Sequence, residues 1–209
     1  MTGYGQGDFP LDSEGDDDIT MAFRPAPGGA AAFFEQAQAG VIRSLVSQIA
    51  ELVSADSDAA LGERGAPAAG PGSADDLEAQ LGLSSHEELP DDPVLARLLP
   101  DGYSDDPEAS AEFRRYTEET LRSAKVASAQ TVLASLPPGG GEVRLSEPEC
   151  QQWLRALNDV RLALSVRLGI TDENDDLMEH LSAEDPRSAY IWVYQWLAYL
   201  QDSLIEALS

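Results

Sequence analysis

Residues 146–169, SEPECQQWLRALNDVRLALSVRLG, decide the fold, because they carry a complete set of signals for one long amphipathic helix. Ser146 and Glu149 form a capping box at its start, Pro148 fits its first turn, and Gly169 is a suitable residue to end it. Apolar residues recur at helical spacing and predict a buried stripe made of Trp153, Leu157, Val160, Leu164 and Leu168. This segment indicates a mainly α protein.

Further helices are predicted on both sides of this segment. Residues 30–54, AAAFFEQAQAGVIRSLVSQIAELVS, repeat Ile42, Leu45, Ile49 and Leu52 at helical spacing. Another long helix is expected to start at Ser104 as N-cap and to run to about Leu136, where PPGGG must end it. The remaining predictions are short helical turns at 73–83 and 93–99, and a last helix that begins near Pro186.

Two short strands accompany the helices. DITMAFRP, residues 18–25, places Ile19, Met21 and Phe23 on one side of a strand, and GEVRL, residues 141–145, leads directly into the capped helix. Both strands are too short to be stable alone, so we expect them to pair into a ribbon against the helices. The predicted fold class is a helical bundle with a small two-stranded β element and a disordered internal insert.

Charge and composition divide the chain into regions. Residues 1–18 and 55–92 hold 16 of the 38 acidic residues but only one of the 13 basic residues, Arg64, so the rest has a formal charge of about −10 rather than −25. We expect residues 1–18 to be a disordered acidic tail. Residues 19–209 are expected to form a single helical domain, interrupted by a flexible Ala/Gly/Pro/Asp-rich linker at about 55–89.

The same composition disfavours several classes of function. An acidic chain with a single Lys repels phosphate backbones, so direct DNA binding is not expected. The start of the chain lacks the basic and apolar parts of a signal peptide, and no apolar run is long enough to span a membrane. One cysteine rules out an intrachain disulfide and fits a reducing compartment. The expected location is the cytoplasm.

Catalytic and metal-binding motifs are missing from the sequence. It contains no G-x-S-x-G, H-E-x-x-H, C-x-x-C or P-loop pattern, and its two histidines have no second nitrogen or sulfur ligand nearby. A calcium loop starting at Asp172 fails, because Leu177 stands where the pattern needs Gly and Ala183 where it needs Glu. We therefore expect no enzyme activity, no cofactor and no metal.

Cys150 is the candidate redox thiol. It lies in the first turn of the capped helix, where the helix dipole lowers a thiol pKa, whereas Glu147 and Glu149 beside it act in the opposite direction. It also shares a face with Trp153, Leu154 and Leu157, so burial in the core is the favoured interpretation and a redox-sensitive thiol is the functional alternative.

A basic cluster stands out in EFRRYTEETLRSAK, residues 112–125: Arg114, Arg115, Arg122 and Lys125 fall on one arc of the predicted helix. Glu118 lies within that arc, one turn from Arg114 and Arg122, so a ladder of salt bridges is one account. A contact face for an acidic protein partner and a nucleic-acid site are the others. Phe113 and Tyr116, on the other side of the helix, are predicted to be core residues.

The last helix is apolar over about 240° of its circumference. It contains Trp192, Trp196 and Tyr199, and only a narrow strip around Asp202 and Glu206 is reliably polar. Such a helix is either central in the domain or part of an oligomer interface, and we favour the central position. A homodimer through this helix remains the alternative.

Five stretches taken together resemble an actinobacterial family of oxidative-stress transcriptional regulators, also described as a domain of unknown function. They are PDDPVLARLLPDGY, EFRRYTEETLRSAK, LASLPPGGGEVRLSEPE, WLRALNDVRLALSVRLGI and YQWLAYLQDSLIEAL, and the resemblance covers residues 19–54 and 90–209. It implies a cytoplasmic regulator that responds to oxidants through cysteine and acts on transcription, through a sigma factor or RNA polymerase. Genes of this family often lie near those for a Clp protease adaptor and for cysteine synthesis.

This sequence departs from the family's thiol-switch pattern, because Cys150 is alone and cannot form an intramolecular disulfide. The preferred hypothesis is a non-enzymatic regulator that binds a component of the transcription machinery. The alternative is a helical interaction or structural protein, dimeric through its C-terminal helix and linked to Clp proteolysis.

Overall fold

The computed structural model describes residues 22–62, 92–103, 106–170 and 187–209, and all structural statements concern this part of the chain. It contains the helices α1 (Gln36–Gly62), α3 (Pro93–Leu98), α4 (Pro107–Ser135), α5 (Glu147–Leu168) and α7 (Ser188–Ala207). The strands are β1 (Arg24–Ala26), β2 (Gly29–Phe34) and β3 (Gly141–Ser146). The predicted mainly α class with a minor β element is confirmed.

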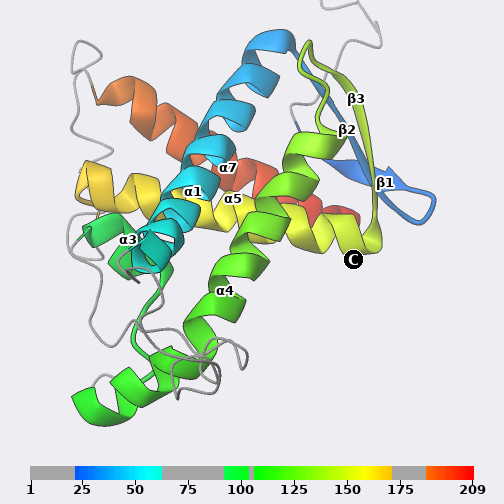
Figure 1. Cartoon of the computed structure of the whole chain (residues 1–209). Helices are drawn as coiled ribbons and strands as arrows, with labels where there is room; N and C mark the ends of the chain where they lie inside the picture. Colours follow the sequence, from blue (N-terminus) through cyan, green and yellow to red (C-terminus); the bar gives the residue numbers. More distant parts are fainter. Residues whose placement is uncertain (1–21, 63–91, 104–105, 171–186) are drawn as a thin grey trace, which may run out of the picture.

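Helix α5 is the element around which the others pack. It contacts α1, α3, α4 and α7, and both β2 and β3 also pack against it, at Trp153 and Cys150. In Figure 1, α1 and α4 cross in front of α5 and α7, and the sheet lies at one end of the bundle. The stripe predicted from the sequence is buried, with Trp153 and Leu157 fully enclosed.

The predicted limits of α5 are confirmed. The Glu149 carboxylate accepts hydrogen bonds from the backbone N–H of Ser146 at 2.8 Å and from its hydroxyl at 2.6 Å. These bonds hold the pKa of Glu149 below its ordinary value. At the other end, Gly169 adopts φ of 68°, a left-handed conformation that suits glycine as a helix terminator.

The sheet has three strands rather than the predicted two. GEVRL forms β3 as expected, but β1 begins at Arg24, and β2 lies in the middle, antiparallel to both neighbours. The residues of β2 were predicted as the start of a helix, which in fact begins at Gln36. Alanines are compatible with either structure, and here the segment pairs along its whole length with β3, which follows far later in the sequence.

The sheet packs against α5 through aromatic side chains. Phe23, Phe34 and Trp153 form a buried cluster with ring centroids 5.5–5.9 Å apart. The loop before β3 fits closely against the start of α1, because a Cβ on Gly140, where φ is 78°, would stand 2.6 Å from the backbone nitrogen of Gln36. Glycine is therefore required at this turn.

Several predicted boundaries are shifted. The N-cap of α4 is Asp106, whose carboxylate accepts from the Ala109 N–H at 3.0 Å, and not Ser104. The backbone of α1 continues to Gly62, beyond the predicted start of the linker. The last helix begins at Ser188. Other predictions lie outside the described residues: the tail at 1–18, Ile19 and Met21 of the first strand, the helix at 73–83, both histidines and the acidic loop at 172–183.

Candidate functional site

The basic cluster of α4 lies inside the molecule. Arg114, Glu118 and Arg122 are only 5%, 3% and 4% exposed. Glu118 accepts hydrogen bonds from both arginines, at 3.2 Å from Nη1 of Arg114 and at 2.9 and 2.7 Å from Nε and Nη2 of Arg122. The salt-bridge ladder predicted from the sequence is confirmed, but it is a buried one.

Groups from neighbouring elements complete this ladder. Arg114 also binds the carboxylate of Asp101 and the carbonyl of Leu99, and Arg122 binds the carbonyl of Val53 in α1 at 2.8 Å. The bond to Arg114, followed by that to the Ser110 hydroxyl, lowers the pKa of Asp101. Within the described part of the chain, two guanidinium groups thus face two carboxylates and their charges balance, which is the condition under which buried ions are tolerated.

Lys125 pairs separately, with Asp159 of α5 at 2.6 Å. Burial raises the pKa of Asp159, although the hydrogen bond to Lys125 acts in the opposite direction. Arg115 is half-buried. The partner-contact face, one of the alternatives drawn from the sequence, is therefore not formed by Arg114 and Arg122, because the side of α4 that carries them faces α1 and the loop before α4.

The opposite side of α4 is aromatic and exposed. Phe113 and Tyr116, predicted to be core residues, are 45% and 57% exposed. Phe113 packs edge-on against Tyr103, with ring centroids 5.9 Å apart. The prediction was wrong because helical periodicity identifies two faces but does not say which one points inward when one is ionic and the other aromatic.

Cys150 is fully buried where β3 meets α5. Its Sγ lies 3.9 Å from the carbonyl oxygen of Leu145. Burial is the main cause that raises the pKa of this thiol, and the charges of Glu149 and Glu147 raise it further, against the lowering by backbone N–H groups at Ala30 and Cys150. This environment holds the thiol in its protonated, unreactive form.

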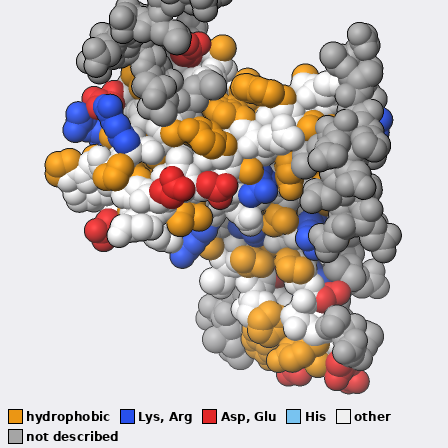
Figure 2. All heavy atoms as spheres, turned by 180° about the vertical axis from the view of Figure 1, so that it is seen from behind, with side chains coloured by type: hydrophobic (Ala, Val, Ile, Leu, Met, Phe, Trp, Pro, Cys, Tyr) orange, Lys and Arg blue, Asp and Glu red, His pale blue; other side chains and the backbone are white. Residues whose placement is uncertain are grey.

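We had favoured a central position for helix α7, and this prediction was wrong. The helix lies at the surface with one side exposed. Its inner side packs on α5 and β1, whereas Trp192 and Tyr199 are 54% and 49% exposed. Trp192 stacks on the buried Trp196, with centroids 5.8 Å apart. Figure 2, the view from behind, shows hydrophobic side chains gathered across this face with acidic side chains among them.

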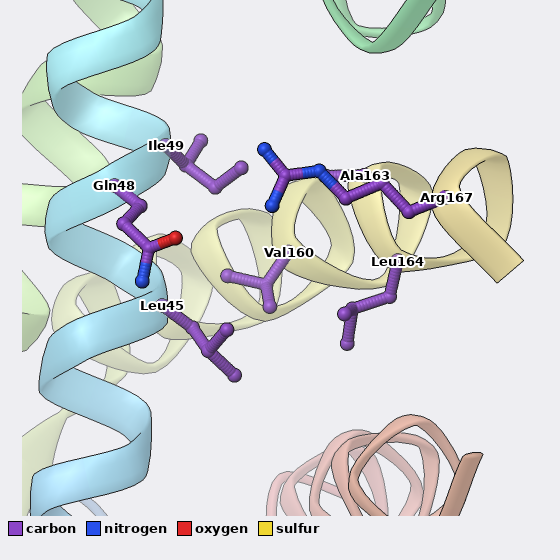
Figure 3. Close-up of a pocket in the computed structure, with 7 residues that line it drawn as sticks. All are labelled: Leu45, Gln48, Ile49, Val160, Ala163, Leu164 and Arg167. Atoms are coloured by element: carbon purple, nitrogen blue, oxygen red, sulfur yellow. The ribbon is translucent and has the colours of Figure 1, made fainter. Parts of the chain in front are cut away.

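A shallow pocket lies between α1 and α5 (Figure 3). Apolar side chains form its floor, and the polar ends of Gln48 and Arg167 stand at its rim. It contains no acid–base pair or nucleophile, and the described residues hold no group of three potential metal ligands.

The described helices include none long and apolar enough to span a membrane. In α4, the ion pairs within the fold involve Arg114, Glu118, Arg122 and Lys125, whereas Phe113 and Tyr116 are exposed.

Comparison with known proteins gives a family and a set of relatives. The model of a family described as a domain of unknown function, DUF2017, matches residues 20–208. The chain is 38% identical over 148 residues to the oxidative stress regulator AosR of Mycobacterium bovis and to that of Mycobacterium tuberculosis. It is 37% identical, also over 148 residues, to the putative oxidative stress regulator AosR of Mycobacterium leprae.

The alignments cover 64% of this chain, and 66% of the M. bovis and M. tuberculosis proteins and 67% of the M. leprae protein. No solved structure matches the chain.

Proposed function

Because this chain belongs to the DUF2017 family, and relatives over a third identical are named oxidative stress regulators, we propose that it is a stress-responsive regulator of transcription. In this proposal it is a non-enzymatic protein of the cytoplasm that acts by binding other proteins. Its partner is a sigma factor or RNA polymerase, the partners implied by the family resemblance.

The observation that supports action by protein contact is the exposed aromatic side of α7. Trp and Tyr are enriched at protein interfaces and are frequent among the residues that dominate binding energy. Trp192 and Tyr199 lie about two helical turns apart on one face, each about half exposed. A large exposed aromatic surface on a folded domain is typical of a binding site.

An oxidant response through Cys150 would require the protein to open locally before the thiol could react. The thiol is enclosed between β3 and α5, so an oxidant reaches it only when this corner opens. With one cysteine, the products are a disulfide to another molecule or a capped thiol. We propose that regulation operates through partner binding and does not require Cys150.

The test is affinity purification of the tagged full-length protein from an actinobacterium, with and without oxidant treatment. We expect RNA polymerase or sigma subunits to be recovered, and to be lost when Trp192→Ala and Tyr199→Ala are combined. The variant Tyr116→Ala, which changes an exposed aromatic residue on α4, is the matched control. Recovery of no transcription protein under either condition would count against the proposal.

The second candidate is a structural or interaction protein that dimerises through α7 and is linked to Clp proteolysis. The exposed Trp192 and Tyr199 would then pack on a second copy. Light scattering of the purified chain separates the two candidates, because a dimer abolished by Tyr199→Ala favours the second and a monomer favours the first.

A further inference from the structure

Helix α7 already binds one arginine of its own chain. The guanidinium of Arg161 in α5 lies over the ring of Tyr194, 5.0 Å from its centroid, and its Nη1 donates to Oε1 of Gln201 at 2.7 Å. Tyr194 and Gln201 are seven residues apart, about two helical turns, and so lie on one face of the helix. An aromatic ring and an acceptor two turns later thus both contact one guanidinium here.

The exposed side of α7 repeats this arrangement without an occupant from the described chain. Tyr199 and Glu206 have the same seven-residue spacing, and both are exposed. The acceptor is now a carboxylate, which binds a guanidinium more strongly than an amide does. Trp192, seven residues before Tyr199, extends the aromatic surface, and Asp202 adds a second exposed carboxylate beside it.

The charged side chains of α7 itself are all acidic. Helix α7 contains no Lys or Arg between Ser188 and Ala207, and neither Asp202 nor Glu206 forms an ion pair within the described part of the chain. The whole chain has a formal charge of −25. A second copy would bring equal charge to this face at an electrostatic cost, whereas a basic segment is attracted to it.

An unsatisfied donor marks the same surface. Trp196 is nine-tenths buried beneath Trp192, and its indole Nε1–H has no hydrogen-bond partner among the residues that the structure describes. Buried indole N–H groups are usually bonded, and this donor is itself buried, so a carbonyl of a bound chain reaches it only if the stacked ring of Trp192 moves on binding.

We propose that the exposed side of α7, formed by Trp192, Tyr199, Asp202 and Glu206, binds an arginine-containing segment of a basic partner protein. The guanidinium stacks on Tyr199 and pairs with Glu206, as that of Arg161 stacks on Tyr194 and bonds Gln201. Arginine is preferred to lysine because its planar group stacks and donates at the same time. This inference rests on the proposed function and gives the chemistry of the partner.

A random peptide library, selected on the immobilised full-length chain at about 0.15 M salt, tests the proposal. We expect the selected peptides to contain arginine. Their affinity should fall about tenfold with Tyr199→Ala, with Glu206→Gln, and when the peptide arginine is replaced by citrulline, its uncharged isostere. Tyr116→Ala and Glu119→Gln, which change exposed residues of α4, should leave the affinity unchanged. Circular dichroism verifies that each variant is folded.

Selected peptides without arginine, or peptides that bind citrulline and arginine forms equally, would overturn the proposal. So would a dimer that dissociates in the Tyr199→Ala variant, since the surface would then belong to a second copy. The outcome is distinguishable from failure of the proposed function. If polymerase is recovered equally by wild type and Glu206→Gln, only the arginine site is wrong. If arginine peptides bind α7 but no transcription protein is recovered, only the regulatory role is wrong.

Discussion

Cys150 is the residue on which an oxidant response would most simply depend, and its surroundings oppose reaction. The thiol is fully buried, and its pKa is raised chiefly by that burial. We predict that a disulfide reagent labels the native protein about 100-fold more slowly than the unfolded chain, because reaction must wait for local opening. Labelling is followed by absorbance with and without denaturant. Equal labelling rates would mean that the thiol is accessible in the native protein and that Cys150 can react with oxidants directly.

Glu149 makes the stability of the start of α5 depend on pH. Its pKa is lowered in the folded protein, first by the Ser146 hydroxyl and then by the Ser146 N–H. A lowered pKa means that its charged form stabilises the fold above the ordinary pKa of the group, and that this contribution is lost as pH falls through the folded value.

We therefore predict that Glu149→Gln is less stable than the wild type at pH 7 and that the two converge on acidification. Glutamine retains a capping-box acceptor but cannot titrate. The measurement is the denaturant midpoint at a series of pH values down to the start of acid unfolding. Glu147→Gln, a neighbour in the same turn, is the control. A difference that grows as pH falls would contradict the assignment.

At the scale of elements, α4 shows how an ionic face can be the inner one. Glu118 is enclosed between two guanidinium groups, so removing its charge leaves an excess of buried positive charge. We predict that Glu118→Gln lowers the free energy of unfolding by about 3 kcal/mol. The exposed neighbour Glu119→Gln should change it by less than about 0.5 kcal/mol. Chemical denaturation measures both.

A third variant distinguishes charge imbalance from loss of packing. Replacing Arg114, Glu118 and Arg122 together by Met, Leu and Met removes the three buried charges of the ladder while filling similar volume, and leaves only the partly exposed Asp101. Buried ion clusters replaced in this way are often no less stable than before. We expect this variant to be at least as stable as Glu118→Gln, and greater instability would show that the hydrogen bonds of the ladder outweigh the cost of its desolvation.

The sequence predicted elements well where the signals were local. The capping box, Gly169 and the apolar stripe of α5 are all local in sequence, and the structure places them as expected. Two predictions were wrong where residues outside the segment determine its structure or its orientation. Strand β2 is an alanine-rich segment whose pairing with β3 is invisible in its own residues. Which side of α4 faces inward depends on acceptors outside the helix. These are the carbonyls of Val53 and Leu99 and the carboxylate of Asp101, which accept hydrogen bonds from its arginines.

The same limit applies to the candidate surfaces. Trp192, Trp196 and Tyr199 could be singled out from the sequence, but not which of them is exposed, since α7 is apolar almost all round. The pairing of Tyr194 and Gln201 with Arg161 could not be found either, because it joins α7 to α5. The seven-residue repeat along α7 was a signal that could have pointed to it.

Across the whole molecule, cations join one helix to the next. Arg43 of α1 donates to the carbonyls of Leu133 and Leu136, where α4 ends, at 2.6 and 2.7 Å. Lys125 links α4 to α5, and Arg161 links α5 to α7. Together with Arg114 and Arg122, these side chains are turned toward protein acceptors. This acidic protein has few basic side chains, and many of them form hydrogen bonds or ion pairs between its own helices.

This use of cations leads to a prediction about nucleic acid. Affinity for duplex DNA depends on the number of phosphates that Lys and Arg neutralise, and it falls steeply as salt rises. Here the strongest basic cluster is buried and balanced by carboxylates, and the chain as a whole carries −25. We predict no retarded band with promoter or random duplex DNA at about 50 mM salt, where such binding is strongest. Retardation at low salt that disappears by about 200 mM would contradict this, and would require a basic surface that the packing of α4 does not provide.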